Sequence, residues 1–315
     1  MYGLLGRGIN RSLSGLEAAI RVLLLGVAAG GGLPQWNCAC VRCQQARDGV
    51  ITPQTQSSVA LSDDAGNWFL INASPDLPLH LRTYVELAPR PGSPRNSPIQ
   101  GVFLTSADVD HVLGLLSLRE GNALHIYTTP AIQRAAAILG VTTVLQSFCG
   151  VSWHHPNEEG FTELPGSSLR VRALPLAGRA PRYAGESSDG GVYTIALHIK
   201  DERTGGRLLV APGVAALSGP LQEAAKDSDA VLMDGTFWSE DELSRVRAGA
   251  RGASEMGHLP IKDGTMPFLS ALSSRYRVYV HINNTNPIFS PASPERATVE
   301  SAGVIVGHDG MRFDL

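Results

Sequence analysis

Short apolar runs of strand length recur along this chain, and their order constrains the fold more than any other feature. The runs at 59–61 and 68–70 flank the polar segment 63–67, which is typical of a hairpin. Helical patterns fall between the later runs, near 112–120, 130–139, 218–226 and 261–273. The other strand-like runs are 21–27, 102–105, 124–128, 168–173, 193–199, 207–210, 230–233, 276–282 and 304–306. Paired strands followed by interposed helices predict a mixed sheet, or two sheets, covered by helices.

Composition indicates a folded protein and excludes several function classes. The 315 residues are 43% hydrophobic and 17% charged, which suits a packed core and not a disordered chain. A net charge of -3, without a basic stripe that carries interleaved aromatic residues, gives no electrostatic case for nucleic-acid binding. No apolar segment reaches the roughly 20 residues that a membrane-spanning helix needs. We therefore predict a soluble, cytoplasmic protein that contacts neither nucleic acid nor membrane.

The first thirty residues have two interpretations. Basic residues precede the apolar run 22–29, an arrangement that resembles a signal peptide. The same run is also typical of a buried strand over 21–27 that ends in the glycine loop 30–32. We favour the strand, because the loop leads directly into a cysteine cluster that is typical of a structural site. Residues 1–20 are then an N-terminal extension with no evident role, and residues 21–315 form the domain.

The cysteine cluster consists of Cys38, Cys40 and Cys43 within a single turn. Disulfides between such close neighbours would crosslink almost nothing, whereas three thiolates can wrap one tetrahedral Zn²⁺ with a fourth ligand from elsewhere. We predict a structural zinc here; unbound thiols are the alternative. A His, an Asp or a side-chain amide such as that of Asn284 remain open as the fourth ligand. Cys149 lies far away in the sequence and is expected to be a buried apolar side chain.

An Asp and a His lie side by side where a strand meets a helix. Asp110 and His111 follow the apolar run 102–104 and precede the apolar segment 112–118. A carboxylate and an imidazole at the mouth of a sheet suit a divalent metal or an acid–base centre. The alternative is that Asp110 caps the helix and His111 is a core histidine with satisfied hydrogen bonds.

Three further candidates occupy similar positions along the chain. Asp234 ends a buried strand at a Gly turn, His258 lies in a Gly/Pro loop before a helix, and His281 lies near the end of a strand. Each has an ordinary structural interpretation when it is taken alone. Their joint recurrence at strand ends, where functional residues gather, favours a single site.

The ordered set of Asp-His, strand-end Asp, Gly-His and strand-end His resembles the metallo-β-lactamase-fold superfamily. The segments 68–77, 114–121 and 281–287 resemble its pyrroloquinoline quinone (PQQ) biosynthesis protein B family, and the likeness extends over residues 21–315. This resemblance implies an α+β fold, a single-domain αββα four-layer sandwich with the site at the sheet edges.

The chain departs from the hydrolases of that superfamily at the metal ligands. Their His-x-His-x-Asp-His motif has Ser106 and Asp108 at its first two His positions here, and the expected later His is absent from 174–179. The first metal site of the hydrolases is therefore largely missing. The ligands that persist are Asp110, His111, Asp234 and His281. Two imidazoles with carboxylates and open positions form a ligand set that non-haem Fe(II) enzymes use, so we favour Fe(II) over Zn²⁺, which would also fit.

The resemblance also implies roles for the remaining residues. His258 corresponds to a histidine that moves protons in related hydrolases, so it is expected to be an acid–base group, or a ligand if the site is rearranged. Asp108 is expected to assist catalysis. Cys38, Cys40 and Cys43 match a cluster that holds structural zinc in the phosphonate-pathway cyclic phosphodiesterases of the superfamily.

Three functions follow from these expectations. The first is a metal-dependent oxygenase of the PQQ pathway, which hydroxylates the tyrosine ring of a Glu-Tyr-derived peptide or amino-acid precursor. The second is a non-catalytic carrier of PQQ or its precursor towards transport into the periplasm. The third is a metal-dependent hydrolase that acts through activated water. Contacts with other PQQ-pathway proteins and a homodimer are compatible with the sequence.

Overall fold

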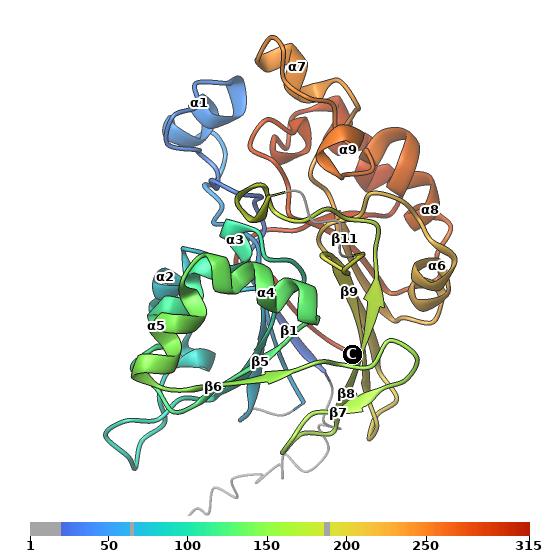
Figure 1. The fold of residues 1–315 in the computed structure, drawn as a ribbon. Helices are drawn as coiled ribbons and strands as arrows, with labels where there is room; N and C mark the ends of the chain where they lie inside the picture. Colours follow the sequence, from blue (N-terminus) through green and yellow to red (C-terminus); the bar gives the residue numbers. More distant parts are fainter. Residues whose placement is uncertain (1–19, 64–65, 186–189) are drawn as a thin grey trace, which may run out of the picture.

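The structure, a computed structural model, describes residues 20–63, 66–185 and 190–315. The strands of this described part form two sheets of seven strands each, with helices on the outside (Figure 1). The first sheet has the order β14 (Arg312–Asp314), β1 (Arg21–Gly26), β2 (Ser58–Ser62), β3 (Trp68–Ile71), β4 (Ile99–Phe103), β5 (Leu124–Tyr127) and β6 (Val151–His154). The second has the order β13 (Ile305–Val306), β12 (Tyr276–Val280), β11 (Ala230–Asp234), β10 (Arg207–Ala211), β9 (Ile195–Asp201), β8 (Leu169–Pro175) and β7 (Thr162–Glu163).

Helices complete the outer layers of the sandwich. On the side of the first sheet lie α2 (Leu77–Thr83), α4 (Pro130–Ile138) and α5 (Val141–Phe148), and on the side of the second lie α6 (Gly219–Lys226), α8 (Met266–Ser270) and α9 (Pro294–Ser301) (Figure 1). Three short helices, α1 (Val41–Arg47), α3 (Val109–Val112) and α7 (Glu242–Val246), lie at one end of the sandwich. The predicted α+β, single-domain αββα sandwich is confirmed.

Each sheet is antiparallel in one half and parallel in the other. Strands β1, β2 and β3 pair antiparallel, and β3 to β6 pair parallel. In the second sheet β7 to β10 are antiparallel and β10 to β13 are parallel. Short connections join the antiparallel pairs β2–β3, β7–β8 and β9–β10, whereas crossovers that contain helices return the chain to each parallel neighbour. The antiparallel pairs β1–β2 and β8–β9 are joined by longer segments, 27–57 and 176–194. Strands β2 and β3 pair as the predicted hairpin requires, and residues 64–65 of its turn lie outside the described residues.

Two predicted helices are less regular than their periodicity indicated. The pattern at 112–120 is the end of α3 followed by a 3₁₀ segment, Leu113–Leu118. Backbone hydrogen bonds to a distant segment explain why the α-helix stops here. The Ala73 amide donates to the His111 carbonyl, and the Gly114 amide donates to the Ala73 carbonyl. The pattern at 261–273 is a π turn, Ile261–Thr265, followed by the short α8. Sequence periodicity also missed β6, β7, β14 and the helices α1, α2, α5, α7 and α9.

The N-terminal strand is held by the C-terminus of the chain. Ile20, placed in the extension by the sequence, is fully buried and exchanges two backbone hydrogen bonds with Leu315. Residues 1–19 of the predicted extension lie outside the described residues. Within the described part of the chain, no helix combines the length and apolar character needed to cross a membrane.

The two sheets are joined by backbone contacts at the end where α3 begins. The Ala29 amide donates to the Ile282 carbonyl at 2.8 Å, which ties the loop after β1 to the segment after β12. The Ile195 amide donates to the Thr105 carbonyl at 2.9 Å, which ties β9 to the segment after β4. These contacts fix the spacing of the two strand-end segments that carry the predicted site.

Candidate metal centre

Asp110, His111 and His281 converge between the two sheets. Asp110 and His111 lie on α3, directly after β4, and His281 follows β12 of the other sheet. One ligand atom from each lies within 4.8 Å of the others. Asp110 Oδ2 is 3.9 Å from His111 Nε2 and 3.4 Å from His281 Nε2. The predicted pairing of the Asp-His motif with the strand-end His is therefore present in the tertiary structure.

Unusual backbone conformations position these residues. His281 has a φ of 55°, and Asn72, which follows β3 beside β4, has a φ of 61°. Left-handed conformations of residues other than glycine cost on the order of 1–3 kcal/mol and persist where surrounding structure holds them. The Asn72 side chain accepts a 2.9 Å hydrogen bond from the Thr105 amide, and the Ile282 amide donates to the Val27 carbonyl at 2.8 Å.

Asp234 and His258 form a second group that shares His281. Asp234 Oδ2 accepts from the Val214 amide at 2.8 Å and from His258 Nδ1 at 2.6 Å, and Oδ1 accepts from the Thr236 amide and hydroxyl at 2.9 and 2.6 Å. The His258 ring stacks on the His281 ring with centroids 5.6 Å apart. Four donors occupy the buried Asp234 carboxylate, which would have to release one of them to bind a metal.

Burial and charge set the protonation of the first group. Burial alone would raise the pKa of Asp110, but His111 and His281 hold it well below its usual range. Burial lowers the pKa of His111, which favours the neutral ring. Burial acts against the charged form of His281 too, but the contact with Asp110 raises its pKa. The ionised Asp110 carboxylate thus favours a positive charge beside it, and a metal ion that binds there would replace the proton of His281.

The residues of the first group fit a divalent metal ion. The Nε2 atom of His111 is buried and has no hydrogen-bond partner, although its Nδ1 atom is bonded to Ser106 at 2.8 Å. An unpartnered buried nitrogen is costly unless a ligand completes it. This nitrogen points at Asp110 and His281. One ion could contact all three ligand atoms at metal–ligand distances of about 2.1 Å.

The cysteine cluster has a fourth polar group at its centre. Cys38, Cys40 and Cys43 carry sulfur atoms within 4.8 Å of one another. The Asn284 side-chain nitrogen lies 3.2 Å from the sulfurs of Cys38 and Cys43 and 3.8 Å from that of Cys40. Because the two ends of an amide are nearly identical in shape, a rotation brings its oxygen to the same place. Burial raises the pKa of the Cys40 thiol to about 11, so a zinc ion would displace its proton.

Two residues singled out from the sequence, Asp108 and Cys149, lie outside these groups of ligand residues. Asp108 is exposed, and its Oδ2 accepts a 2.7 Å hydrogen bond from the Ser106 hydroxyl. Cys149, expected to be buried, is half-buried at the end of α5, where its thiol bonds to the Leu145 carbonyl. The prediction for Cys149 is confirmed in part, because the side chain packs against the core but stays partly exposed where α5 ends.

Sequence reasoning missed several residues that shape the site. Thr236 contacts both Asp234 and His281, but a Thr in a Gly turn carries no distinctive pattern. Gly30 leaves room for Asp110, since a Cβ atom there would lie 3.3 Å from the carboxylate. The Tyr183 hydroxyl donates to the Ala107 carbonyl at 2.5 Å from a loop that is remote in sequence. Only their spatial placement reveals these three residues.

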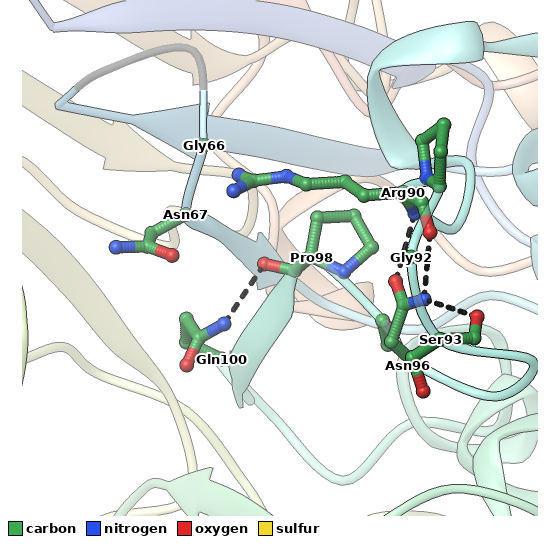
Figure 2. Close-up of a pocket in the computed structure, with 10 residues that line it drawn as sticks. Gly66, Asn67, Arg90, Gly92, Ser93, Asn96, Pro98 and Gln100 are labelled. Atoms are coloured by element: carbon green, nitrogen blue, oxygen red, sulfur yellow. Dashed lines mark hydrogen bonds between the residues drawn. The ribbon is translucent and has the colours of Figure 1, made fainter.

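A separate hollow lies at the opposite end of β4. This cavity has a volume of about 300 Å³. Figure 2 shows residues that line it, with the Asn96 side chain bonded to the Arg90 and Ser93 backbones and with Asn67 and Gln100 along the wall. Strand β4 begins at this cavity and ends just before the Asp-His motif. Five strand residues span about 16 Å, so the cavity is distinct from the metal centre.

A mixed-sheet αββα sandwich with His and Asp side chains gathered at its strand ends defines a metallo-β-lactamase-fold protein. Residues 67–282 match the family model of the β-lactamase superfamily domain. A diphosphatase from the PhnP family shares the fold, with a TM-score of 0.66 at 16% identity over 94% of this chain and 97% of that one.

Closer relatives identify the branch of the superfamily. The coenzyme PQQ synthesis protein B of Rhizobium meliloti (strain 1021) is 41% identical over 304 residues, which cover 94% of this chain and 98% of that protein. The crystal structure of Zn²⁺-bound PqqB from Methylobacterium extorquens has a TM-score of 0.85 at 38% identity, over 94% of this chain and all of that one. This chain belongs to the coenzyme PQQ synthesis protein B family.

Proposed function

We propose that this protein hydroxylates the tyrosine ring of a Glu-Tyr-derived PQQ precursor, with Asp110, His111 and His281 as the ligands of an active-site Fe(II). The observation that carries the proposal is the convergence of two imidazoles and one carboxylate from opposite sheets. This ligand set on one side of an ion leaves positions open and is typical of non-haem Fe(II) oxygenases. The Zn²⁺-bound relative supports a divalent metal in this family.

The reaction needs an oxidant and a reductant besides the precursor. For each hydroxyl group added, a ring C–H becomes C–OH, O₂ is the oxidant, and its second oxygen atom leaves as water with two protons. A small-molecule two-electron donor such as ascorbate completes the balance. A redox-active metal would supply the chemistry that lets O₂ react with a phenol ring.

The Asp234–His258 pair is suited to proton transfer. His258 Nδ1 lies 2.6 Å from Asp234 Oδ2, so the carboxylate orients the ring through Nδ1 and Nε2 is the nitrogen that remains for proton exchange. Burial opposes ionisation of Asp234, but His258 lowers its pKa. We assign His258 Nε2 the removal of the phenol proton and Asp234 the orientation of the His258 ring. Asp234 is also a further candidate ligand of the metal. Asp108 assists from the rim of the site.

For the cysteine cluster we propose a structural Zn²⁺ held by Cys38, Cys40, Cys43 and the Asn284 side-chain oxygen. The proposal is supported by the position of the amide, which contacts all three sulfurs. Asn284 follows the same strand β12 that carries His281. A zinc ion there would connect the loop before α1 to the segment that holds the active-site histidine. The position of the family in the PQQ pathway makes other pathway proteins natural partners.

The test is a hydroxylation assay with isotopic oxygen. Anaerobically purified protein is loaded with Fe(II) and given a Glu-Tyr peptide, ascorbate and ¹⁸O₂, and the peptide mass is measured. We expect ¹⁸O in the ring with the unsubstituted protein and with His154→Ala, an imidazole variant outside the site, and a loss of at least 100-fold in His111→Ala. Absence of labelled product from the unsubstituted protein would contradict the proposal.

The same samples separate the two other functions. Tight binding of PQQ or the peptide that is unchanged in His111→Ala and Asp234→Ala, without hydroxylation, would identify a carrier. Turnover of a phosphodiester such as bis(p-nitrophenyl) phosphate that disappears in His111→Ala would identify a hydrolase that acts through activated water.

A further inference from the structure

The Ser106 hydroxyl makes three hydrogen bonds beside the metal centre. Its oxygen lies 2.7 Å from Asp108 Oδ2, 2.8 Å from His111 Nδ1 and 3.2 Å from the Asp108 amide. A serine hydroxyl has one proton to donate and two lone pairs with which to accept. Ser106 is 4% exposed, so bulk water does not compete for these bonds.

The partners determine the direction of each bond. The Asp108 amide is a donor only, so Ser106 accepts from it. An ionised carboxylate is an acceptor only, so the single Ser106 proton is committed to Asp108 Oδ2. The remaining lone pair of Ser106 then requires a donor at His111 Nδ1. The proton of a neutral His111 ring is therefore on Nδ1, and Nε2 carries the free lone pair.

We propose that Ser106 and Asp108 are positioning residues that fix His111 as the Nδ1–H tautomer and so prepare its Nε2 atom for the metal. The proposal rests on the proposed function only in taking His111 as a metal ligand. The buried Nε2 atom without a hydrogen-bond partner is where this arrangement places the lone pair. Substitution of a residue that hydrogen-bonds to a ligating histidine typically lowers metal affinity 10–100-fold.

A matching arrangement stands behind the histidine of the other sheet. The Thr236 hydroxyl lies 2.6 Å from Asp234 Oδ1 and 2.8 Å from His281 Nδ1. The Thr236 hydroxyl also lies 2.9 Å from the His281 carbonyl oxygen, so its single proton goes to one of two acceptors, that carbonyl or the Asp234 carboxylate. In either case His281 Nδ1 must be the donor in its bond with Thr236. Each sheet thus contributes one carboxylate–hydroxyl–imidazole chain, and in both chains the Nε2 atom faces Asp110. Two independent occurrences of this geometry argue against a chance contact of Ser106.

The first measurement is the tautomer itself. Two-bond ¹H–¹⁵N correlation spectra of metal-free, histidine-labelled full chain at pH 8 distinguish the protonated ring nitrogen from the bare one, with His111→Gln used for assignment. We expect Nδ1–H for His111 in the unsubstituted protein. In Ser106→Ala we expect the proton to move to Nε2, where Asp110 Oδ2 is the nearest acceptor. Ser106→Thr keeps the hydroxyl group and should retain the Nδ1–H form.

The second measurement is metal affinity, determined by Co²⁺ titration against a chromophoric chelator. We expect Ser106→Ala to bind 10–100-fold more weakly and Ser228→Ala, which removes a buried hydroxyl elsewhere, to bind normally. An Nε2–H ring in the unsubstituted protein, or an unchanged tautomer or unchanged affinity in Ser106→Ala, would overturn the proposal. Neither measurement needs O₂ or precursor, so a failed hydroxylation assay leaves this result standing.

Discussion

Asp110 Oδ2 and His281 Nε2 lie 3.4 Å apart, although the two residues belong to opposite sheets of the sandwich. The contact brings the segment after β4 to the segment after β12. It creates a site that neither sheet possesses alone, because the first sheet supplies Asp110 and His111 and the second supplies His281. Metal binding at this point is therefore expected to depend on the packing of the two sheets.

Two separate metal sites predict separable losses of metal. Elemental analysis of anaerobically purified protein should find iron lost in the Asp110→Ala/His111→Ala variant and zinc lost in the Cys38→Ser/Cys40→Ser variant. The reason is that the cysteine cluster shares no residue with the group of Asp110, His111 and His281.

The control for this experiment is Cys149→Ser, a thiol outside both groups, which should retain both metals. A single zinc that ignores Asp110 and His111 would show that the site between the sheets does not hold metal, and the carrier function would then be favoured.

Gly30 provides the space that the Asp110 carboxylate occupies. A Cβ atom at Gly30 would lie 3.3 Å from Asp110 Cγ and Oδ2, so Gly30→Ala must displace the carboxylate by a few tenths of an ångström. We expect Co²⁺ affinity to fall on the order of 10-fold, as it does when a residue that supports a metal ligand is substituted. Thermal stability should change little. Gly219→Ala, where the new methyl group meets open space, is the matched control. Equal affinities in both variants would show that Asp110 does not need this space.

His198 makes stability depend on pH. Burial, together with the nearby Arg172 guanidinium, lowers the pKa of His198 to about 4 in the folded protein. The unfolded chain therefore binds more protons than the folded protein between pH 6.5 and 4. The free energy of unfolding has its full value above pH 6.5 and decreases as pH falls through this window. A shift of this size corresponds to about 3 kcal/mol in the free energy of unfolding.

Urea unfolding of the unsubstituted protein and of His198→Phe at several pH values tests this prediction. The difference between their unfolding free energies should change in favour of the variant as pH falls from 6.5 to 4. The corresponding difference for His125→Phe, an exposed position, should change little. A constant difference for His198→Phe would refute the assignment.

Phe103, the last residue of β4, anchors the strand that leads into the metal centre. It is fully buried, and its ring centroid lies 4.8 Å from that of Tyr127 and 6.2 Å from that of Phe69. Phe103→Ala is expected to lower the free energy of unfolding by about 3–5 kcal/mol, because a large cavity forms in the core. The same substitution at Phe148, which is 64% exposed, should change it by about 0.5 kcal/mol or less. Urea unfolding of both variants measures the contrast.

Most strands were predictable because their apolar runs are long enough to show, whereas the layered sandwich was implied by the family resemblance. Strands β2, β3 and β11 are buried along their whole length, and each contains at least three consecutive apolar residues. Short edge strands such as β7 and β14 carry no such signal, since two or three residues cannot show a period. The apolar run after His111 suggested a regular helix, but the bonds to Ala73 turned it into a 3₁₀ segment.

The sequence by itself determined the fold class, the strand-end positions of Asp110, His111, Asp234 and His281, and the cysteine cluster. The strands, the candidate residues and the cysteine cluster follow from local patterns, because hydrophobic periodicity and residue type can be seen in neighbouring positions. The αββα sandwich was implied by the resemblance to a known family. Only the tertiary structure decided that four donors occupy Asp234, that Asn284 lies among the sulfurs, and that Ser106 stands behind His111. Such relationships join segments that are far apart in the chain or depend on side-chain direction, and both are set by how the two sheets pack.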